Sequence, residues 1–345
     1  MKNILMMNDL QNFRLQYVYI AFLFSIFGFS EALANDKLPG EDPDPITCLG
    51  HFHVLDNVYD FCDTCGCGSS GGSMGYGTGL NNNFIGVRYI GQQYRSRDGI
   101  FNDSPWIDEN FNTMQLWGNF PVSNRTVVNV IVPYQFHSRK FSDNTTQHIN
   151  GLGDVSVLAM YNVLKVRPDS IVAIAPEHYV QIGGGVKIPT GTFDKANNTG
   201  SVNPSFQLGN GSWDYVLAAN YGFNYRNWGV STLFNYSLKT ENPKEYQFGN
   251  QFNYAVNAFK TYYPANNFTI TPIIGVAGEL YETNKEYGEE VANTKGDIFL
   301  GKVSLEASYS RYALGVVSML PISQNLNNDK VELKNRLSIY LNVNF

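Results

Sequence analysis

RLSIYLNVNF, residues 336–345, ends the chain and predicts its fold. One parity of this stretch is apolar (Leu337, Ile339, Leu341, Val343, Phe345) and the other is mostly polar (Arg336, Ser338, Tyr340, Asn342, Asn344). Successive side chains of a strand point to opposite faces, so this period of two predicts a strand with two different faces. Lipid can cover such an apolar face, which here ends with Phe345. The stretch therefore predicts the closing strand of an outer-membrane β-barrel.

The N-terminal residues 1–34 read as a secretory signal peptide. Arg14 precedes a mostly apolar run, Leu15 to Ser30, and Ala32-Leu33-Ala34 forms an A-x-A cleavage site. The alternative is a membrane anchor, but the run is short for a spanning helix, which needs about 20 apolar residues. No later stretch is long and uniformly apolar, so a membrane-bound form of this chain would have to cross as strands.

The composition agrees with a barrel in a lipid membrane. Charged residues make up 16% of the 345 residues, whereas Gly (32), Tyr (22) and Phe (23) are abundant. The lipid-facing band of a barrel excludes charge, and its interfacial girdles use aromatic residues. The net charge of −6 and the pI near 5.4 argue against nucleic acid as a partner. Composition predicts the outer membrane of a Gram-negative cell, with membrane lipid as a partner.

Alternation of apolar and polar residues continues over the predicted barrel domain, residues 82–345. We count about twelve strands, an even number as bacterial barrels require. The runs lie near 85–92, 113–120, 125–137, 154–166, 171–188, 213–226, 228–237, 247–257, 266–281, 296–309, 311–322 and 336–345. Residues 183–185 are Gly-Gly-Gly, for which curvature of the barrel is the simplest interpretation and a bulge or close backbone approach the alternative.

Short and long connections alternate between these runs. The short ones lie near 121–124, 167–170, 226–227, 264–267 and 310–311, and the long ones near 96–107, 139–152, 189–212, 282–295 and 323–333. This asymmetry of periplasmic turns and extracellular loops is typical of outer-membrane barrels and predicts both termini in the periplasm. We expect the segments near 139–151 and 189–212 to be solvated outer loops, and the connection near 240–244 is unusually short. A secreted soluble barrel or β-sandwich is the alternative fold.

Several short motifs resemble one known family. They are Val132-Pro133-Tyr134, Gly151-Leu152-Gly153-Asp154, Lys187-Ile188-Pro189-Thr190-Gly191, and the stretch from Gln207 to Asp214 (QLGNGSWD). In this order they resemble the outer-membrane family associated with the MetA pathway of phenol degradation. The resemblance implies a transporter-like barrel for small apolar or aromatic compounds. The Cys-rich head departs from this pattern.

Charged residues on the inward parity are candidates for a polar constriction that screens solutes. The alternative is that they pair or contact water, as interior charges of any barrel do. These lumen candidates are Arg88, Asp154, Lys187, Glu279, Lys302 and Glu306.

A hydrolase is the enzymatic alternative. His137-Ser138 and Asn144 suggest a Ser-His-Asn arrangement. Adjacent strand residues point to opposite faces, however, so His137 and Ser138 could pair only beyond the end of the strand. No G-x-S-x-G or H-E-x-x-H motif is present. We therefore predict no enzymatic activity and no catalytic residue.

Residues 35–81 form a predicted Cys/Gly-rich periplasmic head or plug. Its candidate ligands are Cys48, His51, His53, Cys62, Cys65 and Cys67. Secretion favours disulfides, and four cysteines allow three connectivities. Thiolates beside imidazoles also suit Cu(I) or Zn(II), which makes a copper or zinc site the alternative. Covalent haem is disfavoured because Gly66, not His, follows Cys65.

The sequence as a whole predicts an outer-membrane channel or transporter for small solutes. The alternative class is a structural or metal-binding protein, in which a filled barrel displays the head or the outer loops. Alternation alone does not decide between the two, because it does not fix the width of the lumen.

Overall fold

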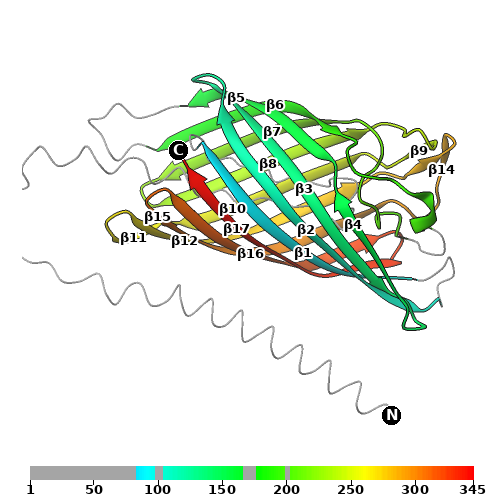
Figure 1. Ribbon diagram of the computed structural model, residues 1–345. Helices are drawn as coiled ribbons and strands as arrows, with labels where there is room; N and C mark the ends of the chain where they lie inside the picture. Colours follow the sequence, from blue (N-terminus) through cyan, green and yellow to red (C-terminus); the bar gives the residue numbers. More distant parts are fainter. Residues whose placement is uncertain (1–82, 98–103, 166–175, 199–202) are drawn as a thin grey trace, which may run out of the picture. The chain divides into compact units, whose positions relative to one another are not determined.

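The computed structural model describes residues 83–97, 104–165, 176–198 and 203–345. The described chain is antiparallel β-structure with one short 3-10 helix, η2 (Lys195–Asn198) (Figure 1). Among these residues, no helix has the length and apolarity to span a membrane. The predicted signal peptide, residues 1–34, and the predicted head, residues 35–81, lie outside the described residues.

Most strands are 10 to 16 residues long. In chain order they are β1 (Phe84–Arg97), β2 (Trp106–Pro121), β3 (Thr126–Lys140), β4 (Thr146–Leu152), β5 (Val155–Lys165), β6 (Glu177–Ile188), β7 (Asp214–Tyr225), β8 (Trp228–Lys239), β9 (Tyr246–Gln247), β10 (Gln251–Lys260), β11 (Tyr262–Ala265), β12 (Phe268–Tyr281), β13 (Lys285–Glu286), β14 (Glu289–Glu290), β15 (Gly296–Tyr309), β16 (Tyr312–Leu326) and β17 (Val331–Asn344).

Fourteen of these strands form one sheet that closes on itself. β1 pairs with both β2 and β17, and β10 pairs with both β8 and β12. Two of the fourteen are continuations, because β4 and β5 follow one another along β3, and β10 and β11 follow one another along β12. The barrel therefore has twelve strands, which confirms the predicted all-β class and strand number.

The quoted C-terminal stretch lies in the closing strand. β17 pairs with β1 from Phe84–Asn344 to Ser96–Val331, and the Phe345 amide donates to the carbonyl of Asn83 at 2.9 Å. Leu337, Ile339 and Leu341 are exposed on the outside. The alternate residues Arg336, Ser338, Tyr340 and Asn342 are buried inside. The predicted parity is confirmed.

The connections at the end of the barrel that holds Phe84 and Asn344 are short. β7–β8, β11–β12 and β15–β16 are each joined by two residues, 226–227, 266–267 and 310–311. Arg226, Asn267 and Ser310 there have φ of 55°, 59° and 54°. Tight hairpins use positive φ because it matches the twist of the strands. In outer-membrane barrels this short-turn end is the periplasmic one.

At the opposite end, the loop end, the strands run further than predicted. β3 and β4 remain paired up to Lys140 and Thr146, and β16 and β17 leave only residues 327–330 between them. The predicted loops near 139–152 and 323–333 are therefore too long. Polar residues occupy both faces of these extensions, so they lack the apolar–polar alternation of a lipid-covered strand. The hydrogen-bonded pairing of the backbones nevertheless continues there.

Three connections at the loop end pack against one another. β9, β13 and β14 form a small separate sheet, and the rings of Phe193 and Tyr246 stack at 5.4 Å. Lys195 donates to Glu286 at 2.8 Å, and this hydrogen bond raises the pKa of Lys195. The strand predicted to begin at 247 begins at Gln251 instead, so the connection from β8 to β10 is not unusually short.

Candidate functional site

The interior of the barrel holds all six predicted lumen residues. Each is at most 5% exposed. Arg88, Lys187, Glu279, Lys302 and Glu306 lie at inward-facing strand positions, and Asp154 lies at the break between β4 and β5. Their inward orientation follows the predicted parity.

The first group is a buried cluster of three charges at the start of the β6–β7 connection. Lys187 Nζ lies 2.6 Å from Asp214 Oδ2 and 3.4 Å from Asp154 Oδ2. Lys187 and Asp214 are direct cross-strand partners on β6 and β7. Asp214 was not among the predicted lumen residues. Its inward-facing position on β7 and its place in the QLGNGSWD motif could have indicated that it lies inside the barrel.

A second group joins β12 to the closing strand. Arg336 Nη1 donates to Glu279 Oε1 at 2.9 Å, and both side chains are at most 2% exposed. The hydroxyl of Tyr281 donates to the other oxygen of Glu279. The sequence placed Arg336 on the polar face of its strand, but Arg336 was not among the predicted lumen residues. The alternation within one strand does not reveal a partner on another strand.

The remaining candidates are Arg88, Glu306 and Lys302. Arg88 Nε donates to Gln115 Oε1 at 3.0 Å, and its guanidinium lies 4.5 Å from the centre of the Trp117 ring. The hydroxyl of Tyr340 donates to Glu306. Lys302 is buried on β15, at the level of Gly275 and Met319 on the neighbouring strands.

Part of the β6–β7 connection lies inside the barrel, which the sequence did not predict. Asn203 donates to Glu109, a buried residue on the inner face of β2. Phe206 is fully buried, with its ring 5.9 Å from Phe111 and 4.4 Å from the Arg139 guanidinium. We call residues 203–212 the inner segment. The expectation of a solvated outer loop near 189–212 is wrong for this segment, because its Asn, Ser and Gln side chains find partners in the barrel rather than in water.

The charge cluster fixes both ends of the connection that holds the inner segment. Asp154 accepts from the amides of Gly191 at 2.9 Å and Asn210 at 3.0 Å. Asn210 Nδ2 also donates to Asp214 at 2.7 Å. A Cβ on Gly209 would lie 2.6 Å from the Gly191 backbone, so glycine is required for this close approach. The motifs that resemble the family therefore meet at one buried point.

Inward-facing apolar side chains form one cluster among the buried polar and charged residues of the interior. They come from strands around the whole barrel, and Phe206 of the inner segment belongs to the same cluster. Members on the strands include Ile131, Leu158, Val216, Leu233, Ile273, Leu300 and Val317. The interior thus holds an apolar cluster in addition to its polar and charged side chains.

His137 is buried and forms no pair with Ser138. The backbone N–H of Asn112 donates to its Nδ1 at 3.1 Å, and its Nε2 lies 3.1 Å from Gln135 Oε1. Ser138 lies on the opposite face of β3, as the strand geometry requires. Both ring nitrogens therefore have partners other than a serine.

The predicted metal ligands Cys48, His51, His53, Cys62, Cys65 and Cys67 lie outside the described residues. Over the ranges that the structure describes, no group of three or more His, Cys, Asp or Glu side chains could hold a metal ion. A metal site or a disulfide framework in the head stays a prediction.

Comparison with known proteins identifies the family. The model of a family described as "Putative MetA-pathway of phenol degradation" matches residues 111–301, more than half of the chain. The chain belongs to this family. The resemblance stated from the sequence motifs is confirmed. The matched residues of this MetA-pathway family member begin within β2 and end within β15, so they include the strands from β3 to β12 and the inner segment. No curated protein sequence matches the chain.

A solved structure shows the same fold. An outer membrane channel from Pseudomonas putida F1 is 14% identical, with a TM-score of 0.58 over 76% of this chain and 96% of that one. The beta domain of the Bordetella autotransporter BrkA is 7% identical, with a TM-score of 0.47 over 77% and 100%. The family member described here is an outer-membrane β-barrel.

Proposed function

We propose that this family member is an outer-membrane channel for small solutes with an apolar or aromatic part. The observation that carries the proposal is the apolar cluster inside a barrel whose outside is also apolar. The cluster lies among buried polar and charged side chains. It offers a favourable environment to the apolar part of a solute, which water excludes. The family description and the similar Pseudomonas channel support the same function.

Passage requires the inner segment to move, because its side chains fill the space that a solute would cross. Phe206 contacts Phe111 on β2 and His137 on β3, and Asn203 is hydrogen-bonded to Glu109. The barrel wall is held by continuous strand pairing, so we propose that the inner segment moves while the wall stays intact. The charge cluster would hold its base during this motion.

Uptake of an apolar probe by whole cells tests the proposal. The fluorescent probe N-phenylnaphthylamine is suitable because an intact outer membrane excludes it. Cells that express the protein should take it up faster than cells without it, and Phe206→Ala should increase the rate further because it removes the largest side chain from the obstruction. Phe193→Ala is the matched control, since Phe193 lies in the same connection but packs against Tyr246 in the loops.

The pattern of uptake also tests the second candidate function. The charged candidates are at most 5% exposed, which favours a filled barrel that displays its loops or head. If neither the native protein nor Phe206→Ala increases uptake while both show heat-modifiable migration, the channel proposal is wrong and the display function gains support. Equal rates for Phe206→Ala and Phe193→Ala would contradict the role of the inner segment.

We propose no enzymatic activity for the barrel. The hydrolase alternative needs an imidazole beside a hydroxyl, and the His137 ring nitrogens interact instead with Asn112 and Gln135. An assay of ester hydrolysis on the purified protein, with His137→Gln as the control, would contradict this if activity were present and lost in the variant.

For the head, we propose disulfides, with a Cu(I) or Zn(II) site as the alternative. The C-x-x-C-x-C spacing of Cys62, Cys65 and Cys67 supports either chemistry. Mass spectrometry of the non-reduced protein together with elemental analysis separates them. Stoichiometric metal that is lost in Cys65→Ser would establish the metal site, and four free thiols without metal would exclude both.

A further inference from the structure

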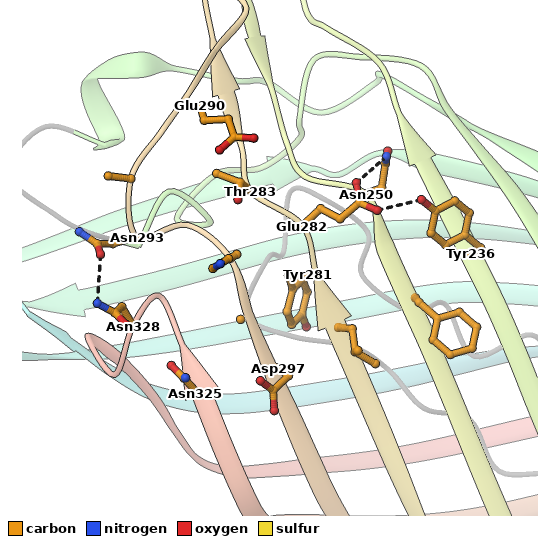
Figure 2. A pocket seen from close by; sticks show the side chains of 15 residues that line it. Tyr236, Asn250, Tyr281, Glu282, Thr283, Glu290, Asn293, Asp297, Asn325 and Asn328 are labelled. Carbon is orange, nitrogen blue, oxygen red and sulfur yellow. Dashed lines mark hydrogen bonds between the residues drawn. The ribbon is translucent and has the colours of Figure 1, made fainter.

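A cavity of about 760 Å³ opens on the outside of the barrel wall at the loop end (Figure 2). Its floor is a row of cross-strand partners on β8, β10, β12, β15 and β16. In this order the partners are Tyr236, Phe252, Leu280, Asp297 and Asn325. Phe252 and Leu280 are exposed, whereas their chain neighbours Gln251 and Glu279 are buried in the interior. The floor therefore belongs to the lipid-facing side of the wall, and its volume is that of a small-molecule site.

One wall of the cavity holds a carboxylate in a fixed position. The hydroxyl of Tyr236 donates to Glu282 Oε1 at 3.0 Å, and Asn250 Nδ2 donates to Glu282 Oε2 at 2.9 Å (Figure 2). On the opposite side, Asn328 Nδ2 donates to Asn293 Oδ1 at 3.3 Å, which joins two loops over the cavity. The polar rim is thus held by hydrogen bonds between separate connections.

The charges that face the cavity are mainly negative. Glu282, Glu290 and Asp297 line it, and Lys295 is the one cation among its lining residues. Within the part of the chain that the structure describes, neither Glu290 nor Asp297 has an ion-pair partner. Asp297 occupies an outward-facing position directly beside Leu280. Both carboxylates are exposed and available to pair with a bound cation.

We propose that this cavity binds an organic cation with an apolar body. The ring of Phe252 and the side chain of Leu280 would contact the apolar part, and Glu290 and Asp297 would pair with the ammonium group. Aromatic rings and carboxylates together recognise ammonium groups through cation–π and ionic contacts. An anionic group such as a lipid phosphate would meet three carboxylates and one lysine, so it is disfavoured. The site lies outside the lumen and does not rest on the proposed channel function.

Binding of three probes of similar shape tests the charge preference. Phenethylamine is cationic, phenethyl alcohol is neutral and phenylacetate is anionic, while all three have one phenyl ring. The full-length protein is placed in uncharged maltoside micelles, and empty micelles give the background from partition into detergent. Flow dialysis should show that phenethylamine binds about tenfold more tightly than the alcohol, with no binding of phenylacetate. Equal binding of the amine and the alcohol would overturn the proposal.

Two sets of variants separate the ionic and apolar contributions. Glu290→Gln combined with Asp297→Asn should weaken binding of phenethylamine about tenfold and leave the alcohol unchanged. Phe252→Ala should weaken both probes. Glu241→Gln combined with Asp143→Asn removes the same two charges from exposed sites outside the cavity and should change nothing. If this control weakens amine binding as much as the cavity variant does, net charge rather than the site is responsible, and the proposal is wrong.

The cation could come from a lipid headgroup or from solution. Addition of phosphatidylethanolamine to the maltoside micelles distinguishes the two sources. Reduced phenethylamine binding after this addition would identify an amine-bearing lipid as the occupant, and unchanged binding would identify a water-borne amine. Whichever source supplies the cation, the variant that combines Glu290→Gln with Asp297→Asn should no longer bind phenethylamine more tightly than phenethyl alcohol.

Discussion

Lys187 is the residue on which the interior of the barrel depends most directly. Its ammonium lies between Asp154 and Asp214, and all three side chains are at most 2% exposed. The two carboxylates also accept from Gly191 and Asn210. Removing the cation would leave two buried carboxylates side by side, and a buried charge without a partner is strongly destabilising.

We expect Lys187→Met to lower the free energy of unfolding by about 3–5 kcal/mol. Urea titration of the protein in detergent micelles measures this change. Lys195→Met is the matched control, because the Lys195–Glu286 pair is more than one third exposed and such surface pairs contribute about 0–1 kcal/mol. A similar small loss for both variants would show that the buried cluster does not stabilise the fold.

Ile339 tests the lipid-facing side of the closing strand. It is 41% exposed and lies five residues before the end of β17, near the middle of a strand length that spans a membrane. Ile339→Arg should cost about 2–4 kcal/mol, because an arginine at the midplane must leave water. Tyr312→Arg, also outward but beside the short turn at Ser310–Arg311, should cost about 0–1 kcal/mol.

Heat-modifiable migration and urea titration report both changes. An equal cost at Ile339 and Tyr312 would contradict a bilayer around this face, because the depth dependence comes from the lipid and not from the strand.

At the scale of elements, two of the three consecutive glycines of β6, Gly183 and Gly185, allow the close approach of β5. A Cβ on Gly183 would lie 2.3 Å from the Ala159 carbonyl oxygen, and one on Gly185 would lie 2.2 Å from that of Val157. The neighbouring strand, not a plug, makes this close approach. The register shift between β5 and β6 lies at Asn162–Leu164, so no bulge occurs at the glycines themselves.

We expect Gly183→Ala to destabilise the barrel by about 1–3 kcal/mol, because the obstacle is backbone and cannot rotate away. Gly184→Ala is the control on the adjacent residue. Its Cβ would have no atom nearer than 3.4 Å, so the expected change is neutral or slightly stabilising. Denaturant midpoints of the two variants provide the test. Equal effects would mean that crowding at Gly183 is relieved by movement of the strand.

At the scale of the whole molecule, closure depends on a pairing between the two ends of the described chain. β1 and β17 meet with Val87 opposite Leu341, and both side chains are exposed. Residues more than two hundred positions apart are therefore neighbours, and the order of the strands around the barrel follows their order in the sequence.

We expect Val87→Cys combined with Leu341→Cys to form a disulfide on oxidation, because directly opposed strand residues have suitable Cα separations. Peptide mapping by mass spectrometry of the non-reduced protein detects the bond among the native cysteines. Val87→Cys combined with Leu337→Cys is offset by four residues, about 13 Å along the strand, and should not cross-link. Efficient bonding of the offset pair would contradict the closing register.

The sequence alone determined the twelve strands, their two faces, the closing strand and the inward orientation of Arg88, Lys187 and Glu279. These features follow from a local pattern, since lipid imposes a period of two on each strand separately. The pattern failed where lipid is absent. Polar extensions such as the β3–β4 hairpin were read as loops, because water accepts polar side chains on both faces.

Only the tertiary structure decided what fills the barrel and where binding sites form. Glu109 and Asn203 are 94 residues apart, Glu279 and Arg336 are 57 apart, and Lys195 and Glu286 are 91 apart. None of these pairs is implied by the alternation within a strand. The inner segment has the composition of a solvated loop, but its polar groups form hydrogen bonds inside the barrel instead of with water. Composition therefore could not distinguish a buried segment from a solvated loop. The floor of the outside cavity likewise depends on the strand register, which places Leu280 between Asp297 and Phe252.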